Sequence, residues 1–483
     1  MRLLLSFGLL LSASTAFAED KPTFRAGAFA MDVTPQKFPV SVNGGFADNI
    51  ATKANDPLHA RCLVLDDGKT KLAVVVVDSC MLPRELLDNA KALAEKATKI
   101  PSSHMMISAT HTHTAPTSTP VFGSPVNADY VEFLTEKIAE GIAKADSNLT
   151  PAGWARGSVQ EPSLLFNRRW KMKPGVLNSD PFGDTTDQVR MNPGHQLPDL
   201  LEQAGPTDPE FSFLAVRSLK GEPIALLANY SLHYVGDLPA LSADYFGVFA
   251  ELVGPAIGAK EGFVGILSNG TSGDVNNVDY KNAPVKTKPG ERSRTVAGVL
   301  AGHIGKAYPK LRFSKECTLA AAQTELELKV RKPAEAEVVR AKAILDKAGD
   351  GKRTARDDVY AHETVEMQKY PDAVKCKLQA LRIGDLAIVG IPCEVFTEIG
   401  LTIKKASPLK ATFTISLANG YNGYLPTPAQ HKLGGYETWR ARSSYLEVDA
   451  SDKMMVEIGK VLNATHATPI SRPFATKSAV RRK

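Results

Sequence analysis

The sequence predicts an α/β protein built as one large domain around a mixed β-sheet. Apolar strand-like segments alternate with amphipathic helical ones, and several of these strands end at a polar side chain. The length of 483 residues, with 43% hydrophobic and 23% charged residues, suits a globular chain. The net charge of +6 is small for this length, and we find neither a basic face nor a nucleic-acid-binding module, so a nucleic-acid partner is not expected.

The N-terminal half supplies a strand, a helix and a second strand. Residues 60–65 and 72–77, joined by an Asp-Asp-Gly turn, predict a β-hairpin. The second arm is apolar throughout, as a strand buried on both faces would be. We expect an amphipathic helix over 84–99, a short strand over 105–108 and another helix over 130–145. Sites in α/β sheets collect at the carboxyl ends of strands, so the residues after 105–108 are candidates for function.

The rest of the chain repeats the pattern of a strand that ends in a polar residue. Residues 156–209 are rich in Pro, Gly, Asn and Asp and predict a long functional loop. The later expected elements are a hairpin over 213–216 and 224–230, a strand over 263–267, a helix over 293–306, charged surface helices over 333–347 and 355–369, a hairpin over 377–383 and 386–391, and a strand over 413–417. Loops 156–209 and 418–440 are expected to cover the site.

The N-terminus of the sequence predicts export, and the basic C-terminus is expected to be a solvated tail. Arg2, the apolar run 3–11 and the small-x-small pattern Ala16-Phe17-Ala18 are typical of a secretory signal peptide. We therefore expect a signal peptide over 1–18, the main domain over 19–470, a basic tail over 471–483, and export to the periplasm or the extracellular space. The apolar run is too short to span a bilayer.

The cysteines do not form a disulfide scaffold, because they are few and odd in number. They are Cys62, Cys80, Cys317, Cys376 and Cys393. One bridge, from Cys317 to Cys376, is compatible with an oxidising compartment. No C-x-x-C spacing occurs, so a zinc site made of thiolates is disfavoured.

His111 and His113 are the first candidates for chemistry. Alternate side chains of an extended segment point the same way, so the two imidazoles can share a metal ion or a substrate. The pair alone is not specific. The x-D-H continuation of the metallo-β-lactamases is missing, and the eightfold strand-helix alternation of the amidohydrolase barrels does not follow. Two solvated loop histidines are the structural alternative.

Three further polar residues follow expected strands: His233, Asp274 and Glu394. Each has a simple structural explanation on its own. A lone histidine is more often structural than a ligand, Asp274 follows a glycine in an ordinary turn, and Glu394 can cap the helix after it. Their combination and order with the His-Thr-His segment give them weight.

That combination resembles the neutral, non-lysosomal ceramidase family. Six segments carry the resemblance, in the family's order and over roughly residues 25–460. They are Ile107 to Pro116 (family T-H-T-H-[ST]-x-P), Asn167-Arg168 (N-R), Asn229 to His233 (N-[FY]-x-x-H), Asn269 to Asn277 (G-D-x-[SN]), Pro392 to Phe396 (P-[GC]-E-x-F), and Tyr421 to Thr427 with Gly435-Tyr436-Glu437 (G-Y-[VLI]-x-T…Y-E).

The resemblance implies a zinc ion held by four side chains, namely His111, His233, Glu394 and Tyr424. Nitrogen and oxygen ligands suit Zn²⁺, and bound zinc lowers the pKa of water toward ~7. The resemblance also implies that His113 handles or orients a proton near the metal. It implies that Arg168 and Tyr436 lie over the scissile carbonyl, where both can donate hydrogen bonds to an oxyanion.

Two departures from the family pattern bear on the mechanism and the substrate. Asn276 stands where the ceramide hydrolases have a serine, and an amide can contact an oxyanion but cannot be a nucleophile. Attack by zinc-activated water survives this change, whereas a serine-dependent reaction does not. We also expect the family's C-terminal β-sandwich to be absent.

The function implied by the resemblance is a secreted zinc hydrolase that cleaves an amide bond, in ceramide or another N-acyl lipid. A lipid substrate implies peripheral contact with a membrane. Two alternatives stay open. One is a zinc hydrolase of the same fold acting on esters or small amides, and the other is a secreted metal-containing binding protein with weakened catalysis. The sequence leaves the oligomeric state open.

Overall fold

The apolar segment 72–77, predicted as a strand buried on both faces, forms β5 (Lys71–Val77), which has a packed layer on each side. The structure is a computed structural model that describes residues 24–349 and 353–466. Val75 packs toward the helices on one face of β5, and Val74 packs into a central core on the other. The predicted hairpin is confirmed by the antiparallel pairing of β5 with β4 (His59–Asp66). The predicted signal peptide and basic tail lie outside the described residues.

A mixed eight-stranded sheet confirms the predicted fold class. Its order is β14 (Val264–Asn269), β13 (Pro223–Tyr230), β12 (Glu210–Ser218), β7 (Thr150–Gln160), β1 (Arg25–Asp32), β4, β5 and β6 (Met105–Ala109). The pairs β13–β14 and β5–β6 are parallel and the others antiparallel. Only two residue pairs, at the first residues of β1 and β7, join the two halves of the sheet.

A four-stranded sheet closes the central core between these halves. Its order is β16 (Leu319–Lys329), β17 (Ala373–Ile383), β18 (Leu386–Gly390) and β20 (Ala411–Ile415). The chain after β20 passes between the two edge strands of the larger sheet. The amide of Ser416 donates to the carbonyl of Asn269, and the amide of Asn419 donates to that of Ile107. The carboxyl ends of β6, β14 and β20 are therefore brought together.

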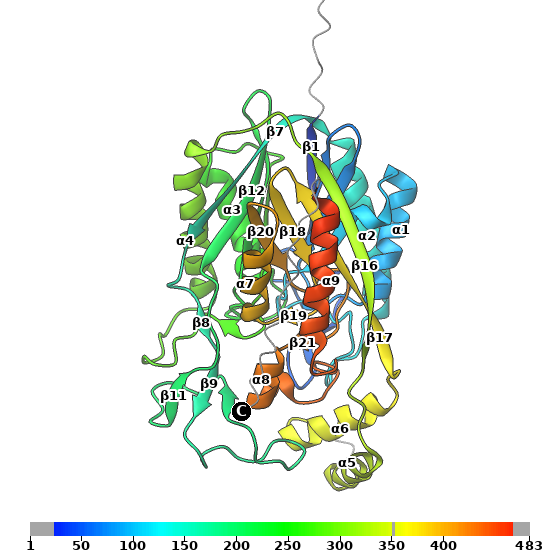
Figure 1. Cartoon of the computed structure of the whole chain (residues 1–483), viewed down its shortest axis with the longest axis vertical. Coiled ribbons are helices and arrows are strands. Elements are labelled where there is room, and N and C mark those ends of the chain that lie inside the picture. The colour runs from blue at the N-terminus through cyan, green and yellow to red at the C-terminus, as the bar shows by residue number, and fades with distance from the viewer. Residues whose placement is uncertain (1–23, 350–352, 467–483) are drawn as a thin grey trace, which may run out of the picture.

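Helices cover the outer faces of these sheets (Figure 1). One half of the large sheet carries α1 (Arg84–Thr98) and α2 (Ala128–Ser147), and the other carries α3 (Asp244–Ala256) and α4 (Glu291–Ala307). The smaller sheet carries α7 (Thr397–Ala406) and α9 (Ala450–Thr465). Short 3₁₀ turns lie at Ser102–His104 and Tyr308–Lys310.

The remaining strands are short, and several of them lie with the remaining helices in the lower half of the molecule in Figure 1. The strands are β2 (Val40–Val42), β3 (Asn49–Ala51), β8 (Phe166–Asn167), β9 (Arg169–Met172), β10 (Val189–Met191), β11 (Leu200–Gln203), β15 (Val275–Asn276), β19 (Glu394–Val395) and β21 (Tyr424–Leu425). The helices are α5 (Glu335–Ala348), α6 (Arg356–Gln368), α8 (Pro428–Leu433) and the 3₁₀ turn Tyr436–Thr438.

Two expectations need correction. Residues 156–209 are not one long loop, because they begin inside β7 and contain the three-stranded sheet β10–β9–β11. The Cys317–Cys376 bridge does not form, and all five cysteines are free thiols. Cys376 lies in the core under α9, whereas Cys317 packs against the central core, so the two sulfurs belong to different layers.

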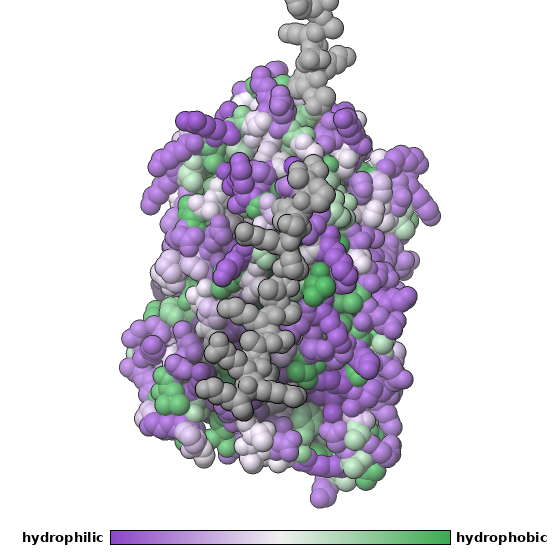
Figure 2. All heavy atoms as spheres, in the orientation of Figure 1, coloured by the Kyte–Doolittle hydropathy of each residue, from purple (hydrophilic) through white to green (hydrophobic). Residues whose placement is uncertain are grey.

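The visible face of the molecule is mainly hydrophilic, with apolar residues scattered over it (Figure 2). Within the described residues, no helix combines the length and apolar character needed to cross a bilayer.

Candidate metal centre

His111 is placed by the chain that leaves β6. The amides of Thr110 and His111 donate to the carbonyls of Val77 and Ser79, so this segment continues the β5–β6 pairing. His111 has a φ of 71°, a left-handed conformation that non-glycine residues rarely adopt. Its ring Nδ1 lies 2.8 Å from the carbonyl oxygen of Cys80. With the proton on Nδ1 and donated to that carbonyl, Nε2 is left with a lone pair.

His233 is placed in the same way by the chain that leaves β13. The loop after β14 runs beside it, and the amide of Gly270 donates to the carbonyl of Tyr230. The Nδ1 of His233 lies 3.1 Å from the carbonyl oxygen of Ser272. A backbone carbonyl that accepts from one ring nitrogen fixes the tautomer, and it directs the other nitrogen at a metal in many metalloenzymes.

Glu394 and Tyr424 face the two histidines from the smaller sheet. They are register partners in the parallel pair β19–β21, just past the carboxyl end of β18. Glu394 is held close to the loop after β14, since a Cβ added at Gly273 would lie 2.6 Å from the carbonyl oxygen of Glu394. Only glycine fits there, and this close approach brings Glu394 into the centre.

Three ligand atoms meet at one point. One imidazole nitrogen each from His111 and His233 and one carboxylate oxygen of Glu394 lie within 4.8 Å of one another, and all three residues are buried. The Nε2 of His111 is 3.2 Å from Oε2 of Glu394. When Nε2 of His111 carries no proton, that carboxylate oxygen has no hydrogen-bond donor among the described residues. Buried carboxylate oxygens without a donor are costly, so the arrangement calls for a cation among these atoms.

A second group of ligand types, Cys80 with His111 and His113, fits a cation less well. The sulfur of Cys80 lies 3.8 Å from Nδ1 of His111, which is the nitrogen already bonded to the Cys80 carbonyl. Burial, the largest effect, raises the pKa of the Cys80 thiol, which disfavours the thiolate that a metal requires. We therefore assign the candidate centre to His111, His233 and Glu394, with Tyr424 beside them.

Arg168 is the buried cation of the site. Its guanidinium donates to the carbonyl of Gly273 at 2.9 Å and to the hydroxyl of Tyr424 at 3.0 Å. It also lies 3.3 Å from Nε2 of His233. The fully buried Glu437 accepts from Nε of Arg168 at 3.1 Å and from Nη1 of Arg169 at 2.6 Å. Glu437 was not predicted as a site residue, although it directly follows Tyr436 in the resembling segment.

His113 lies on the opposite side of His111, with the Nε2 atoms of the two rings 3.1 Å apart. Tyr234 stacks on the His113 ring at a centroid distance of 3.7 Å and an interplanar angle of 16°. A Cβ at Gly44, which has a φ of 116°, would lie 2.5 Å from the same ring. Sequence reasoning missed both contacts. Tyr234 and Gly44 lie outside the six segments that carry the resemblance, and a glycine has no side chain that could act as a ligand.

The charges of the site act on its titratable groups in opposite directions. Burial lowers the pKa of His113, and the charge of Arg168 and that of His111 when protonated lower it further. Burial lowers the pKa of His111, but without a metal ion the Glu394 carboxylate outweighs burial and raises it well above its usual range, so a bound cation would replace a proton on His111. Burial alone would raise the pKa of Glu394, but this proton on His111 and the charge of Arg168 outweigh burial and the pKa is lowered. Burial raises the pKa of Tyr424 well above its usual range, and Glu394 adds to the effect. His113 is therefore neutral and Glu394 ionised at neutral pH.

The free space in front of the candidate centre is small. It measures about 30 Å³ and is lined by His111, His113, Glu394, Tyr424 and Tyr436, among others. A cavity needs roughly 10–15 Å³ by this measure to hold one water molecule, so the space has room for water beside the ligands. Tyr436 also lines a larger chamber of about 390 Å³, and Phe122, which lines the small space too, lines another of about 410 Å³.

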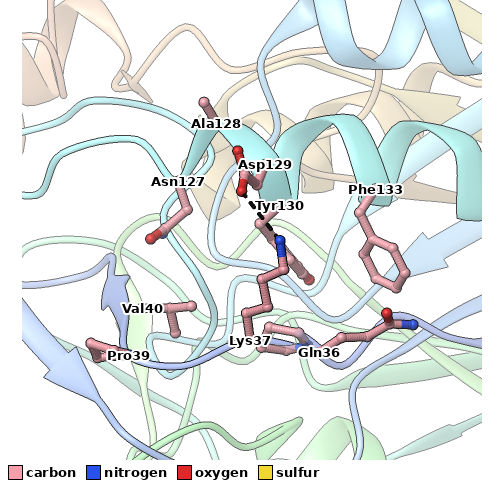
Figure 3. Close-up of a pocket in the computed structure, with 10 residues that line it drawn as sticks. Gln36, Lys37, Pro39, Val40, Asn127, Ala128, Asp129, Tyr130 and Phe133 are labelled. Carbon is pink, nitrogen blue, oxygen red and sulfur yellow. Dashed lines mark ion pairs between the residues drawn. The ribbon is translucent and has the colours of Figure 1, made fainter.

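A different surface pocket, of about 350 Å³, lies at the first turn of α2 (Figure 3). It shares no residue with the space in front of the centre. Its single carboxylate, Asp129, lies 3.8 Å from Lys37, and both side chains are exposed. This pocket lacks the ligand types of a metal site.

Comparison with known proteins identifies the fold. Neither protein-family models nor curated proteins give a match to the sequence. A crystal structure of neutral ceramidase from Pseudomonas aeruginosa matches with a TM-score of 0.68 and 16% identity, over 93% of this chain and 76% of that one. The chain has the neutral ceramidase fold. A second structure, a ceramidase complexed with C2, matches with a TM-score of 0.67 and 15% identity, over 94% of this chain and 78% of that one.

Within this ceramidase fold, seven of the eight predicted site residues share one region. Those seven are His111, His113, Arg168, His233, Glu394, Tyr424 and Tyr436. Asn276 lies apart from the cluster. Its amide donates to the side-chain oxygen of Asn192 at 2.9 Å, and its oxygen accepts from the amide of Val278. These contacts hold the β15 turn, so the structure gives Asn276 no direct contact with the candidate ligands.

Proposed function

We propose that this chain is a zinc-dependent hydrolase that cleaves the amide bond of an N-acyl compound, of which ceramide is one class. The observation that carries the proposal is the meeting of His111, His233 and the donor-free Oε2 of Glu394 beside the buried Arg168. The fold shared with a neutral ceramidase and with a ceramidase complexed with C2 supports an amide substrate. Nitrogen and oxygen ligands with an open position suit catalytic zinc.

The zinc ion, when bound, would supply a Lewis acid that activates water at neutral pH. His113 is neutral, half-buried beside the centre and stacked against Tyr234, so it can take a proton from the attacking water. The same imidazolium can then give the proton to the departing nitrogen. Arg168 is cationic and Tyr436 protonated, and both can donate hydrogen bonds to the oxygen of the carbonyl under attack.

The test combines metal content with hydrolysis. Purified protein should contain about one zinc per chain and should hydrolyse a panel of N-acyl amides more rapidly than matched esters. The variant His233→Ala should lose most of its zinc and nearly all activity. His104→Ala is the matched control, because His104 is partly exposed, its Nδ1 lies 3.1 Å from the carbonyl oxygen of Lys71, and it does not line the space in front of the centre. A folded, zinc-free wild type with full activity would disprove the metal mechanism.

We also propose that the protein is exported. The support is the charged Arg2, the apolar run 3–11 and the Ala16-Phe17-Ala18 pattern. N-terminal sequencing of protein recovered outside the cytoplasm should begin at or near Glu19. A protein that keeps Met1 in that fraction would contradict this proposal.

A further inference from the structure

A chamber of about 390 Å³ lies beside Tyr436, and the proposed mechanism does not use it. Tyr436 lines both this chamber and the small space in front of the candidate centre, so the two are neighbours. One wall of the chamber is β10. The amide of Asn192, just after β10, donates to the carbonyl of Arg168 at 2.9 Å, which fixes this wall against the buried arginine. One arm of an amide substrate placed under Tyr436 would extend into the chamber.

The charge of the chamber is positive. Its cations are Arg190 on β10 and Arg356, which lies over the ring of Trp439 at 5.7 Å. Its single carboxylate, Asp187, is already occupied. One oxygen accepts from the amide of Gly435 at 3.0 Å, and the other accepts from the indole nitrogen of Trp439 at 2.9 Å.

Arg190 is the cation that remains available. Across the described ranges 24–349 and 353–466, no carboxylate comes within 4.0 Å of Arg190, whereas Arg356 is paired with the exposed Asp357 at 2.8 Å. Guanidinium groups bind carboxylates through two parallel hydrogen bonds and lose less hydration than ammonium groups do. An exposed, unpaired arginine beside a chamber next to the reacting group is suited to hold a carboxylate.

Apart from Asn178 and the hydroxyl of Tyr436, the rest of the chamber is apolar. The walls are formed by Val176, Leu177, Val189, Met191 and the ring of Trp439. A ligand with a short apolar part and a terminal carboxylate matches both features, because its carbon skeleton contacts these walls while the carboxylate reaches Arg190. An uncharged alcohol headgroup would leave the guanidinium unpaired.

We propose that the substrates are N-acyl amino acids, amides whose amine side carries a carboxylate that Arg190 binds. This inference rests on the proposed amide hydrolysis and names its substrate class. The reaction is balanced by water alone. The water oxygen forms a bond to the acyl carbon, the carbon–nitrogen bond breaks, and the nitrogen takes a proton. The products are a carboxylic acid and a free amino acid.

The experiment compares two substrates that differ only in charge. N-hexanoyl-alanine carries the carboxylate, and N-hexanoyl-alaninol replaces it with a hydroxymethyl group. The wild type should show a kcat/KM about 10- to 100-fold higher for N-hexanoyl-alanine, the range expected for a charge-assisted hydrogen bond. Arg190→Gln should reduce this ratio to within about threefold of one, chiefly through KM. Salt at 1 M should reduce the wild-type ratio, because the guanidinium is exposed.

The control variant is Arg312→Gln. Arg312 is also exposed and does not line the chamber, so its loss should keep the wild-type ratio. Equal kcat/KM values for the two substrates in the wild type, or an unchanged ratio in Arg190→Gln, would overturn the substrate assignment while amide hydrolysis stands. Failure of the zinc-loaded wild type to hydrolyse these two compounds, ceramide and every other amide tested would instead overturn the proposed function.

Discussion

Replacing Glu437 by glutamine tests whether a buried carboxylate positions Arg168 for catalysis. Glu437 is fully buried and bridges two buried arginines, at 3.1 Å to Nε of Arg168 and 2.6 Å to Nη1 of Arg169. Glutamine keeps the shape of the side chain but removes the negative charge. It also turns one acceptor into an N–H donor that faces a guanidinium. Arg168 keeps its bonds to Gly273 and Tyr424, so it should shift rather than leave the site.

The size of the effect follows from burial. Loss of one partner of a buried ion pair costs about 3–5 kcal/mol of unfolding free energy. Unfolding entropy of ~2.1 cal/mol/K per residue gives roughly 0.9 kcal/mol/K for the described chain, so Tm should fall by about 3–5 °C. A shift of Arg168 by about 1 Å should lower kcat by about 10²-fold. KM should change by less than about threefold, since Glu437 touches no substrate.

The assay measures kcat, KM, zinc content and Tm for Glu437→Gln, Glu437→Asp and a control. The aspartate variant keeps the charge and should recover part of kcat. The control is Glu161→Gln, which breaks a partly buried pair with His303 at 2.7 Å on the α4 side and should lower Tm without changing kcat. Wild-type kcat in a correctly folded, zinc-loaded Glu437→Gln protein would refute the positioning role.

Three further substitutions have expected outcomes. Burial lowers the pKa of Lys91 from 10.5 to about 7. Between pH 7 and 10.5 the unfolded chain therefore binds a proton that the folded chain does not, so the free energy of unfolding rises with pH across that window. Lys91→Met should remove a cost of at most about 5 kcal/mol at pH 6 and flatten this rise in urea titrations. Asn276→Ala should lower kcat by less than about tenfold and cost about 1–2 kcal/mol of stability, because its amide bonds Asn192. Gly273→Ala should reduce the zinc content, since its Cβ would lie 2.6 Å from the carbonyl of Glu394; unchanged zinc would contradict this.

The periodicity of apolar residues predicted the helices and strands that bury one or both faces in the core. The hairpin at β4–β5, helices α1 and α2, and the strand β6 were predicted within two residues at most ends, because their apolar residues recur at the period of the element. The amphipathic strand β16 and the terminal helix α9 were missed. β16 begins with a run of alanines and then alternates glutamate with leucine at the edge of its sheet, so its sequence lacks the continuous apolar run of a buried strand.

Site residues could be predicted from the sequence only where the residue type itself suggests metal binding or catalysis, or where a segment resembles the family. The His-Thr-His pair and the residues after β13 and β18 were found from chemistry and from the resemblance. Glu437, Tyr234 and Gly44 were not, because each acts through a contact between segments far apart in the chain. The stacking of Tyr234 on His113 depends on where β13 lies relative to β6, and those strands stand near opposite edges of the large sheet.

The short pairing between β1 and β7, where the two halves of the large sheet join, determines how the site is assembled. The strand order alone places β6 and β14 at opposite edges, and successive pairings make their directions opposite too. Their carboxyl ends meet only because the two halves are joined by two residue pairs and are bridged on the other side by residues 416–419. His111, His233 and Glu394 therefore come from three parts of the fold that touch at a single place. A substitution that weakens the 416–419 bridge should separate the ligands before it unfolds the sheets. Zinc affinity would then fall at denaturant concentrations where the far-UV circular dichroism is still native, and a coincident loss of both would refute this view.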